Sequence, residues 1–162
     1  MKPVTDYEKI KDLLFNSDKN LFITGPGGTG KTYLINSYLA TATNAIVCGT
    51  TGMAAANIGG DTMHRIFAIP VPACGADLKK IDQSRIKPLI KADVVIIDEI
   101  SMCRNDTFSF MYKVLKKAER LKGKRIRLIV VGDFSQLPPV VTTSDAKLLK
   151  KFGFDTSGFA FT

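Results

Sequence analysis

The residues with the clearest chemical potential form the octapeptide GPGGTGKT, which fits the pattern G-x-x-x-x-G-K-[ST] at every position. Its glycines let successive backbone N–H groups turn inward around phosphate oxygens, and a helix N-terminus there favours negative charge. The lysine of this pattern reaches the β- and γ-phosphates, and its last hydroxyl ligates Mg²⁺. We therefore predict a binding loop for Mg-ATP, rather than a ligand-free turn, formed by Gly25, Pro26, Gly27, Gly28, Thr29, Gly30, Lys31 and Thr32.

A phosphate-binding loop needs a second group to anchor its metal ion, and an acidic pair follows 66 residues after Thr32. The segment VVIIDE places Asp98 and Glu99 at the end of an apolar run that predicts a strand. Ligands of open α/β sheets bind at the carboxyl ends of strands. We expect Asp98 to hold Mg²⁺, directly or through water, and Glu99 to act as a general base toward water. The alternative is that the pair only caps the following helix.

A third apolar run ends in VVGDFSQLPPV, residues 130–140. In a parallel sheet its end would lie beside the two earlier motifs, where the amide of Gln136 could hydrogen-bond the γ-phosphate or the attacking water. Spacing alone favours a simpler interpretation, a tight turn with Pro138 and Pro139 as a rigid exit.

These motifs require a framework of strands and helices. Apolar runs predict strands at residues 20–24, 45–49, 94–97 and 128–131. Helical periodicity or capping patterns predict helices that open at Thr5, follow Lys31, and cover residues 53–58, 82–91 and 105–121, with Pro88 as a kink or an early stop. Strands that are almost wholly apolar and alternate with helices indicate a parallel sheet covered on both faces, an α/β fold. The last fourteen residues predict no closing element, which suggests a fragment.

Composition is that of one globular α/β domain spanning residues 1–162. No apolar run approaches the length of a membrane span, and the N-terminus lacks a secretory signal, so we expect a cytoplasmic protein without a membrane partner. Its three cysteines lack the spacing of a zinc site. Residues 113–127 hold eight basic residues and one acidic residue, which favours a solvated charged face over a nucleic-acid-binding patch.

The three motifs, together with TTGMAAANIGGDTMHRIF at residues 50–67, resemble superfamily 1 DNA helicases of the 5′-to-3′ group. The PIF type is nearest and the RecD-like type is next. The resemblance implies a three-layer RecA-like domain with strand order first, fourth, third, second, and ATP and Mg²⁺ as cofactors. It also implies that Lys31, Glu99 and Gln136 are catalytic, and that Gln136 links the phosphate to the DNA-binding surface.

In this family the stretch matching residues 50–67 lines the track for single-stranded DNA, which makes Thr51, Gly52 and His64 candidate DNA contacts. Phe67 could stack on a base, although Phe is more often buried in a core. For His64, the sequence supports a DNA contact and a buried structural role equally. Residues 1–20 contain no Gln of the kind that reads adenine in the family, so selectivity for ATP over GTP stays open.

The resemblance also implies a second RecA-like domain outside this chain, which supplies arginines to the γ-phosphate. We therefore expect a monomeric motor domain that moves on single-stranded DNA but hydrolyses ATP poorly by itself. The competing functions are a nucleotide-dependent switch and a P-loop kinase. A kinase needs a lid rich in arginine, and the arginines outside residues 120–127 form no such group.

Overall fold

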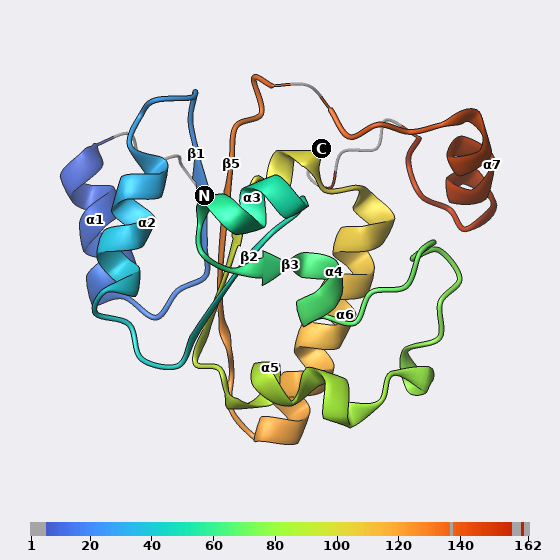
Figure 1. Ribbon diagram of the computed structural model, residues 1–162, viewed down its shortest axis with the longest axis horizontal. Coiled ribbons are helices and arrows are strands. Elements are labelled where there is room, and N and C mark those ends of the chain that lie inside the picture. The colour runs from blue at the N-terminus through green and yellow to red at the C-terminus, as the bar shows by residue number, and fades with distance from the viewer. Residues whose placement is uncertain (1–5, 137, 157–159, 161–162) are drawn as a thin grey trace.

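The computed structural model describes residues 6–136, 138–156 and 160. A parallel sheet of five strands runs through the molecule in the order β1-β5-β4-β2-β3, with helices on both of its faces (Figure 1). The strands are β1 (Leu21–Thr24), β2 (Ala45–Gly49), β3 (Asp61–Thr62), β4 (Val94–Asp98) and β5 (Arg127–Gly132). The α/β fold with a parallel sheet is confirmed.

The predicted four-strand order was incomplete, because β3 adds a fifth strand beyond β2. Only Asp61 and Thr62 make this strand. Two residues carry no detectable hydrophobic alternation, so pairing with Cys48 and Gly49, and not local pattern, defines β3.

One face of the sheet is covered by α1 (Tyr7–Asn16) and α2 (Lys31–Leu39), at the left of Figure 1. Leu14 and Ile35 from these helices pack with Ile96 of β4 and Ile129 of β5. The predicted helix start at Thr5 lies outside the described residues, and in the structure Asp6 caps the helix by accepting a hydrogen bond from the backbone of Glu8.

The opposite face is covered mainly by α6 (Asn105–Lys122), with α3 (Gly52–Asn57), α4 (Met63–Ile66) and α5 (Lys87–Lys91) around it. Its core includes Met111 from α6 and Val95 and Ile97 from β4. The five residues of β4 are all buried, and its four apolar residues, 94 to 97, alternate between the two cores. This explains why the strand is a continuous apolar run instead of an alternating pattern.

Two helix predictions are corrected. Residues 82–91 form a 3₁₀ turn at Gln83–Ile86 followed by α5, and Pro88 lies in the first turn of α5 instead of ending a helix. This position suits proline, because an N–H in the first helical turn has no partner within the helix. A helix that was not predicted also precedes the last fourteen residues and extends only three residues into them: α7 (Thr143–Lys151) begins at a capping box between Thr142 and Asp145. Its single buried residue, Leu149, gave too weak a periodicity to be recognised.

The dense basic stretch is only partly a solvated face. Arg127 is 9% exposed and donates hydrogen bonds to the carbonyl oxygens of Leu13, Leu14 and Lys19 at distances of 2.8 to 2.9 Å. For this residue the interpretation as a solvated cation is wrong. Its guanidinium ties the C-terminal turn of α1 to the start of β5, where a helix dipole favours a cation.

The register of the sheet aligns the functional strand ends. Thr24 at the end of β1 pairs with Gly132 at the end of β5, and Gly49 at the end of β2 pairs with Asp98 at the end of β4. All strands are parallel, so the loops that follow these residues meet at one edge of the sheet, the upper edge in Figure 1. Within the described part of the chain, no helix has the length and apolarity to cross a membrane.

Candidate nucleotide-binding site

The glycine-rich loop joins β1 to the N-terminus of α2. Gly28 and Gly30 have φ values of 76° and 86°, in the left-handed region that residues with a Cβ rarely adopt. The backbone conformation, and not lack of space, requires glycine here, since a Cβ at either position would meet nothing within 4 Å. The loop thereby presents its backbone at the start of a nine-residue helix.

Lys31 lies across this loop. Its Nζ donates to the carbonyl oxygens of Gly25 at 2.6 Å and Pro26 at 2.8 Å, and the Thr29 hydroxyl also donates to Pro26 at 2.8 Å. Thr32 follows in the first turn of α2 and is exposed. The residues that the sequence assigned to phosphate and to Mg²⁺ therefore both lie in the first turn of α2, directly after the loop.

The acidic pair lies at the end of β4. Asp98 is 9% exposed, and its Oδ1 accepts a hydrogen bond from the Glu99 amide at 2.9 Å. Glu99 itself has φ 55° and ψ 39°, a left-handed conformation that costs a non-glycine residue about 1–3 kcal/mol. The Thr50 hydroxyl donates to the Glu99 carbonyl at 2.8 Å, and the Thr50 amide donates to the Asp98 carbonyl at 3.3 Å. These contacts from the end of β2 hold the strained turn in place.

The environment raises the pKa of both carboxyl groups. Burial is the main cause for Asp98, and the nearby positive charge of Lys31 opposes it. For Glu99, burial is again the main cause, the charge of Asp98 adds to it, and Lys31 opposes it. The Oε2 of Glu99 is buried and has no hydrogen-bond partner among the described residues. A carboxylate with a raised pKa and a free acceptor oxygen is suited to take a proton.

The third strand end is organised by a residue that the sequence analysis did not single out. Asp133 is 4% exposed and accepts hydrogen bonds from the Ser135 amide, the Ser135 hydroxyl and, at 3.0 Å, the Gln136 side-chain amide. These bonds, the Ser135 hydroxyl first, lower the pKa of Asp133. The Asp-x-Ser spacing in GDFSQ is that of an Asx turn and could have indicated this role.

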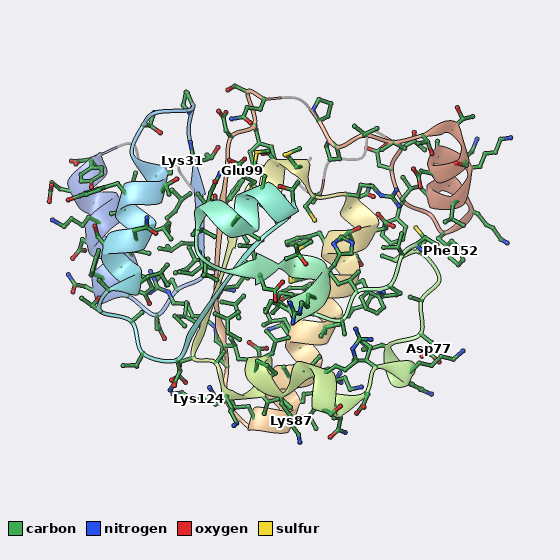
Figure 2. All side chains as sticks on the ribbon, viewed as in Figure 1. Lys31, Asp77, Lys87, Glu99, Lys124 and Phe152 are labelled. Carbon is green, nitrogen blue, oxygen red and sulfur yellow. The ribbon has the colours of Figure 1, made fainter. Side chains whose placement is uncertain are left out.

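The three strand ends lie close to one another around Lys31. Figure 2 shows Lys31 and Glu99 together at the edge of the sheet, and the charge of Lys31 shifts the pKa of Asp98, Glu99 and Asp133. A Cβ on Gly132 would approach Ile100 Cγ2 to 2.9 Å and the Ser101 amide to 3.0 Å, so only glycine allows the turn after β4 to pack this closely on β5. The structure therefore brings Gln136 to the edge that carries the glycine-rich loop, although its side chain is exposed and bound to Asp133.

The candidate DNA contacts divide between two places. Thr51 caps α3 by accepting a hydrogen bond from the Ala54 amide at 3.1 Å, and Gly52 is exposed in the first turn of that helix. Both follow Thr50 and so adjoin the acidic pair. His64 is half-buried on α4 and lines a separate pocket of about 180 Å³ with Thr50 and Arg104, among others.

Burial lowers the pKa of His64, and the nearby Arg104 contributes in the same direction against the opposing charge of Asp106. His64 is therefore held toward its neutral form. Phe67 has no exposed surface and belongs to the core beneath α6, which confirms the core interpretation over base stacking.

Comparison with known proteins identifies the family. The model of the PIF1-like helicase family matches residues 5–157. This chain belongs to the PIF1-like helicase family. The resemblance seen in its motifs is therefore confirmed, and the PIF1-like domain places those motifs together at one edge of its sheet.

Curated relatives of this PIF1-like domain include two bacterial helicases. The ATP-dependent DNA helicase Pif1 of Bdellovibrio bacteriovorus is 36% identical over 138 residues, which cover 80% of this chain and 31% of the relative. That of Campylobacter jejuni is 33% identical over 169 residues, which cover 96% of this chain and 35% of the relative. The chain thus spans about a third of the length of these relatives.

Solved structures of the same family share the fold. Pif1 helicase from Bacteroides in complex with ADP-AlF3 and ssDNA matches with a TM-score of 0.77 and 32% identity, covering 98% of this chain and 39% of that one. Pif1 helicase from Candida albicans matches with a TM-score of 0.74 and 28% identity, covering 99% of this chain and 36% of that one. The three-layer P-loop fold, RecA-like in the sense expected from the motifs, is that of these helicases.

Proposed function

We propose that residues 1–162 are the N-terminal ATP-binding motor domain of a PIF1-type DNA helicase, which couples hydrolysis of Mg-ATP to movement on single-stranded DNA. The observation that carries the proposal is the meeting of three strand ends around Lys31, with the buried Glu99 Oε2 as a free acceptor among the described residues. The Bacteroides Pif1 structure in complex with ADP-AlF3 and ssDNA supports both ligands.

The residues of the loop fit a nucleotide triphosphate and its cation. Lys31 already has its ammonium group over the loop, where it can exchange the Gly25 and Pro26 carbonyls for phosphate oxygens. The backbone N–H groups from Gly25 to Gly30 and the N-terminus of α2 would hold the phosphates. The Thr32 hydroxyl and the Asp98 carboxylate would hold Mg²⁺. When bound, Mg-ATP would supply the γ-phosphoryl group and the cation that neutralises its charge.

Glu99 and Gln136 would act on the water. Glu99 has the raised pKa and free oxygen that a proton acceptor needs, and its backbone is held by Thr50. Gln136 would orient the water or the γ-phosphate, after exchanging its hydrogen bond to Asp133 for one to the ligand. Such an exchange at the end of β5 would report on the presence of the γ-phosphate.

DNA contacts are proposed at Thr51, Gly52 and His64, on the strength of the family motif. Thr51 and Gly52 are one and two residues from Thr50, which holds the turn of Asp98 and Glu99, so a DNA contact there could influence the acidic pair. A second RecA-like domain would complete the site with arginine, a group that is worth about 10³–10⁵ in rate in related enzymes. The chain covers 35% of the Campylobacter relative, whose remaining length is ample for such a domain. We propose that the domain acts as a monomer.

Calorimetry of Mg-ATP binding to the wild-type chain and to Lys31→Ala tests this function. Removal of the charge-assisted bonds to the phosphates should lower the affinity at least about 100-fold, because such bonds contribute roughly 1.5–3 kcal/mol each. Lys9→Ala, an exposed lysine of α1, is the matched control and should bind normally. Equal affinities for all three proteins would show that the loop assignment is wrong.

The competing functions have distinct outcomes. Tight Mg-ATP binding without turnover, even when the downstream sequence is joined to the chain, would favour a nucleotide-dependent switch. Transfer of phosphate to a small acceptor would favour a kinase.

A further inference from the structure

The face of the molecule farthest from the nucleotide site carries the net positive charge of the chain. Residues 79–91 hold five basic residues and one acidic residue, and residues 113–125 hold seven basic residues and one acidic residue. These 26 residues therefore carry +10, while the rest of the chain sums to −2 against a total of +8. Nothing in the proposed ATP chemistry uses this charge.

The two segments are far apart in sequence but form one surface, which we call the basic face. The first segment contains α5 and most of the 3₁₀ turns before it, and α5 and the first of these turns both contact α6. Lys117 of α6 joins the segments directly, because its Nζ donates to the carbonyl oxygens of Leu78 at 3.2 Å and Ile81 at 3.1 Å. Figure 2 shows Lys87 and Lys124 at the end of the molecule opposite Lys31 and Glu99.

The acidic residues of the basic face leave most of its charge unneutralised. Glu119 pairs with Lys116 at 2.7 Å, and Asp82 uses its carboxylate to cap a 3₁₀ turn through Ser84. The neighbouring Asp93 pairs with Lys122 at 2.7 Å. Within the part of the chain that the structure describes, the exposed cations of the basic face that take part in no ion pair include Lys87, Lys91, Lys113 and Arg120.

The chemistry of the basic face distinguishes between kinds of nucleic acid. Sites for single strands combine cations with aromatic side chains on which bases stack. Neither segment contains an aromatic residue, and the neighbouring Tyr112 already has Lys116 Nζ 5.3 Å from the centre of its ring. Nine of the twelve cations are lysines, which act as point charges toward phosphate and read no base pattern. Phosphates are the accessible groups of a duplex, whose bases are stacked inside.

We propose that the basic face binds the phosphate backbone of double-stranded DNA without sequence preference. It would hold duplex on the side of the domain opposite the nucleotide site, separate from the single-strand contacts proposed at Thr51, Gly52 and His64. The binding depends on charge and not on Mg-ATP. Its affinity falls with salt because each neutralised phosphate releases condensed counterions.

The test measures binding of a fluorescent duplex of random sequence to the wild-type chain and to a variant with Lys87, Lys91, Lys113 and Arg120 changed to Gln. A second variant with Lys9, Lys11, Lys147 and Lys150 changed to Gln is the control, since it removes the same charge from exposed positions elsewhere. We expect the affinity of the first variant to fall at least about tenfold at roughly 50 mM salt. The slope of log K against log salt should become shallower by about 0.9 for each phosphate that the basic face no longer neutralises, up to about 3.6.

Several outcomes would overturn the proposal. One is an equal fall in the affinity of the control variant, which would mean that net charge alone attracts DNA. Another is no saturable duplex binding by the wild-type chain, as expected of a solvated face. Equal competition by single-stranded DNA or by poly-L-glutamate at the same charge concentration would reject a duplex surface in favour of a general polyanion surface.

Two further measurements separate this proposal from the nucleotide site. Thermal unfolding of both variants establishes that they fold. Calorimetry should give the variant of the basic face a normal Mg-ATP affinity, because none of its changed residues lies at the nucleotide edge. Duplex binding by a wild-type chain that fails to bind Mg-ATP would refute the proposed motor function and leave the duplex surface standing.

Discussion

Arg104 gives the sharpest prediction about what holds the domain together near its functional edge. Its guanidinium donates to both carboxylate oxygens of Asp106, at 3.0 and 2.8 Å, and pairs with Asp145 at 2.7 Å. Asp106 is 1% exposed at the start of α6, and Asp145 is in the first turn of α7. One side chain therefore compensates a buried charge and ties α7 to the rest of the domain.

Replacement of Arg104 by Met keeps an unbranched side chain at this position and removes its charge. Asp106 would then be a buried carboxylate that still accepts a hydrogen bond from the Cys74 thiol, with its Sγ at 3.2 Å. Loss of one partner from a buried ion pair costs about 3–5 kcal/mol. We expect Arg104→Met to lower the free energy of unfolding at neutral pH by this amount, measured by urea denaturation.

The destabilisation should depend on pH in a definite direction. Burial alone raises the pKa of Asp106, but hydrogen bonds from Arg104 and Cys74 outweigh it, so the net pKa is below the ordinary value. A lowered pKa stabilises the wild-type fold above the unfolded pKa of about 4, and this stabilisation disappears as pH falls through the folded pKa. In Arg104→Met the uncompensated burial raises the pKa instead. The difference between the two proteins should therefore be largest at neutral pH. It should shrink as pH falls through the raised pKa of Asp106 in the variant toward its lowered pKa in the wild type, so that it is already smaller at about pH 4.

A double variant tests whether the buried charge is the cause. Arg104→Met with Asp106→Asn removes the buried charge together with its partner and should recover most of the stability. Arg125→Met is the control, because this arginine is exposed and donates to the side chain of Asn20 at 2.9 Å, away from any buried carboxylate. If the double variant were as unstable as Arg104→Met, or if the destabilisation were the same at neutral pH and at about pH 4, buried charge would not be its cause.

Two further predictions concern the turn after β4 and the core. Glu99→Asn should raise the free energy of unfolding at neutral pH by about 1–2 kcal/mol in urea denaturation, because Asn tolerates the left-handed backbone and carries no buried charge. The same change should abolish ATP turnover, because it removes the proposed proton acceptor. The raised pKa of Glu99 means that its carboxylate destabilises the fold above the unfolded pKa of about 4, so the stability gained by Glu99→Asn should fade as pH falls toward that value. A variant less stable than the wild type at neutral pH would contradict the backbone strain inferred at Glu99. Phe67→Ala should cost about 3–5 kcal/mol by the same assay, since the ring is fully buried, whereas a cost below about 1 kcal/mol would contradict its place in the core.

Much of the candidate site is encoded locally. The octapeptide ending in Thr32 specifies a loop because glycine at positions 28 and 30 supplies the positive φ values that the turn requires. The apolar run ending in Asp98 specifies a strand buried on both faces, and it fixes which end of that strand is polar. Motifs of this kind need only the chemistry and the order of neighbouring residues to be recognised. The family follows from their combination.

What only the tertiary structure decided are the contacts between segments far apart in sequence. The two-residue strand β3 exists through its pairing with β2, and the buried role of Arg127 depends on the end of α1, more than a hundred residues earlier in the chain. Thr50 supports Glu99 across two adjacent strands. Local patterns carry no information on such partners, because a hydrogen bond or a charge is satisfied by whatever the fold brings near it. The sequence by itself determined the chemistry of the nucleotide edge, and the packing of the sheet determined which residues hold that edge together.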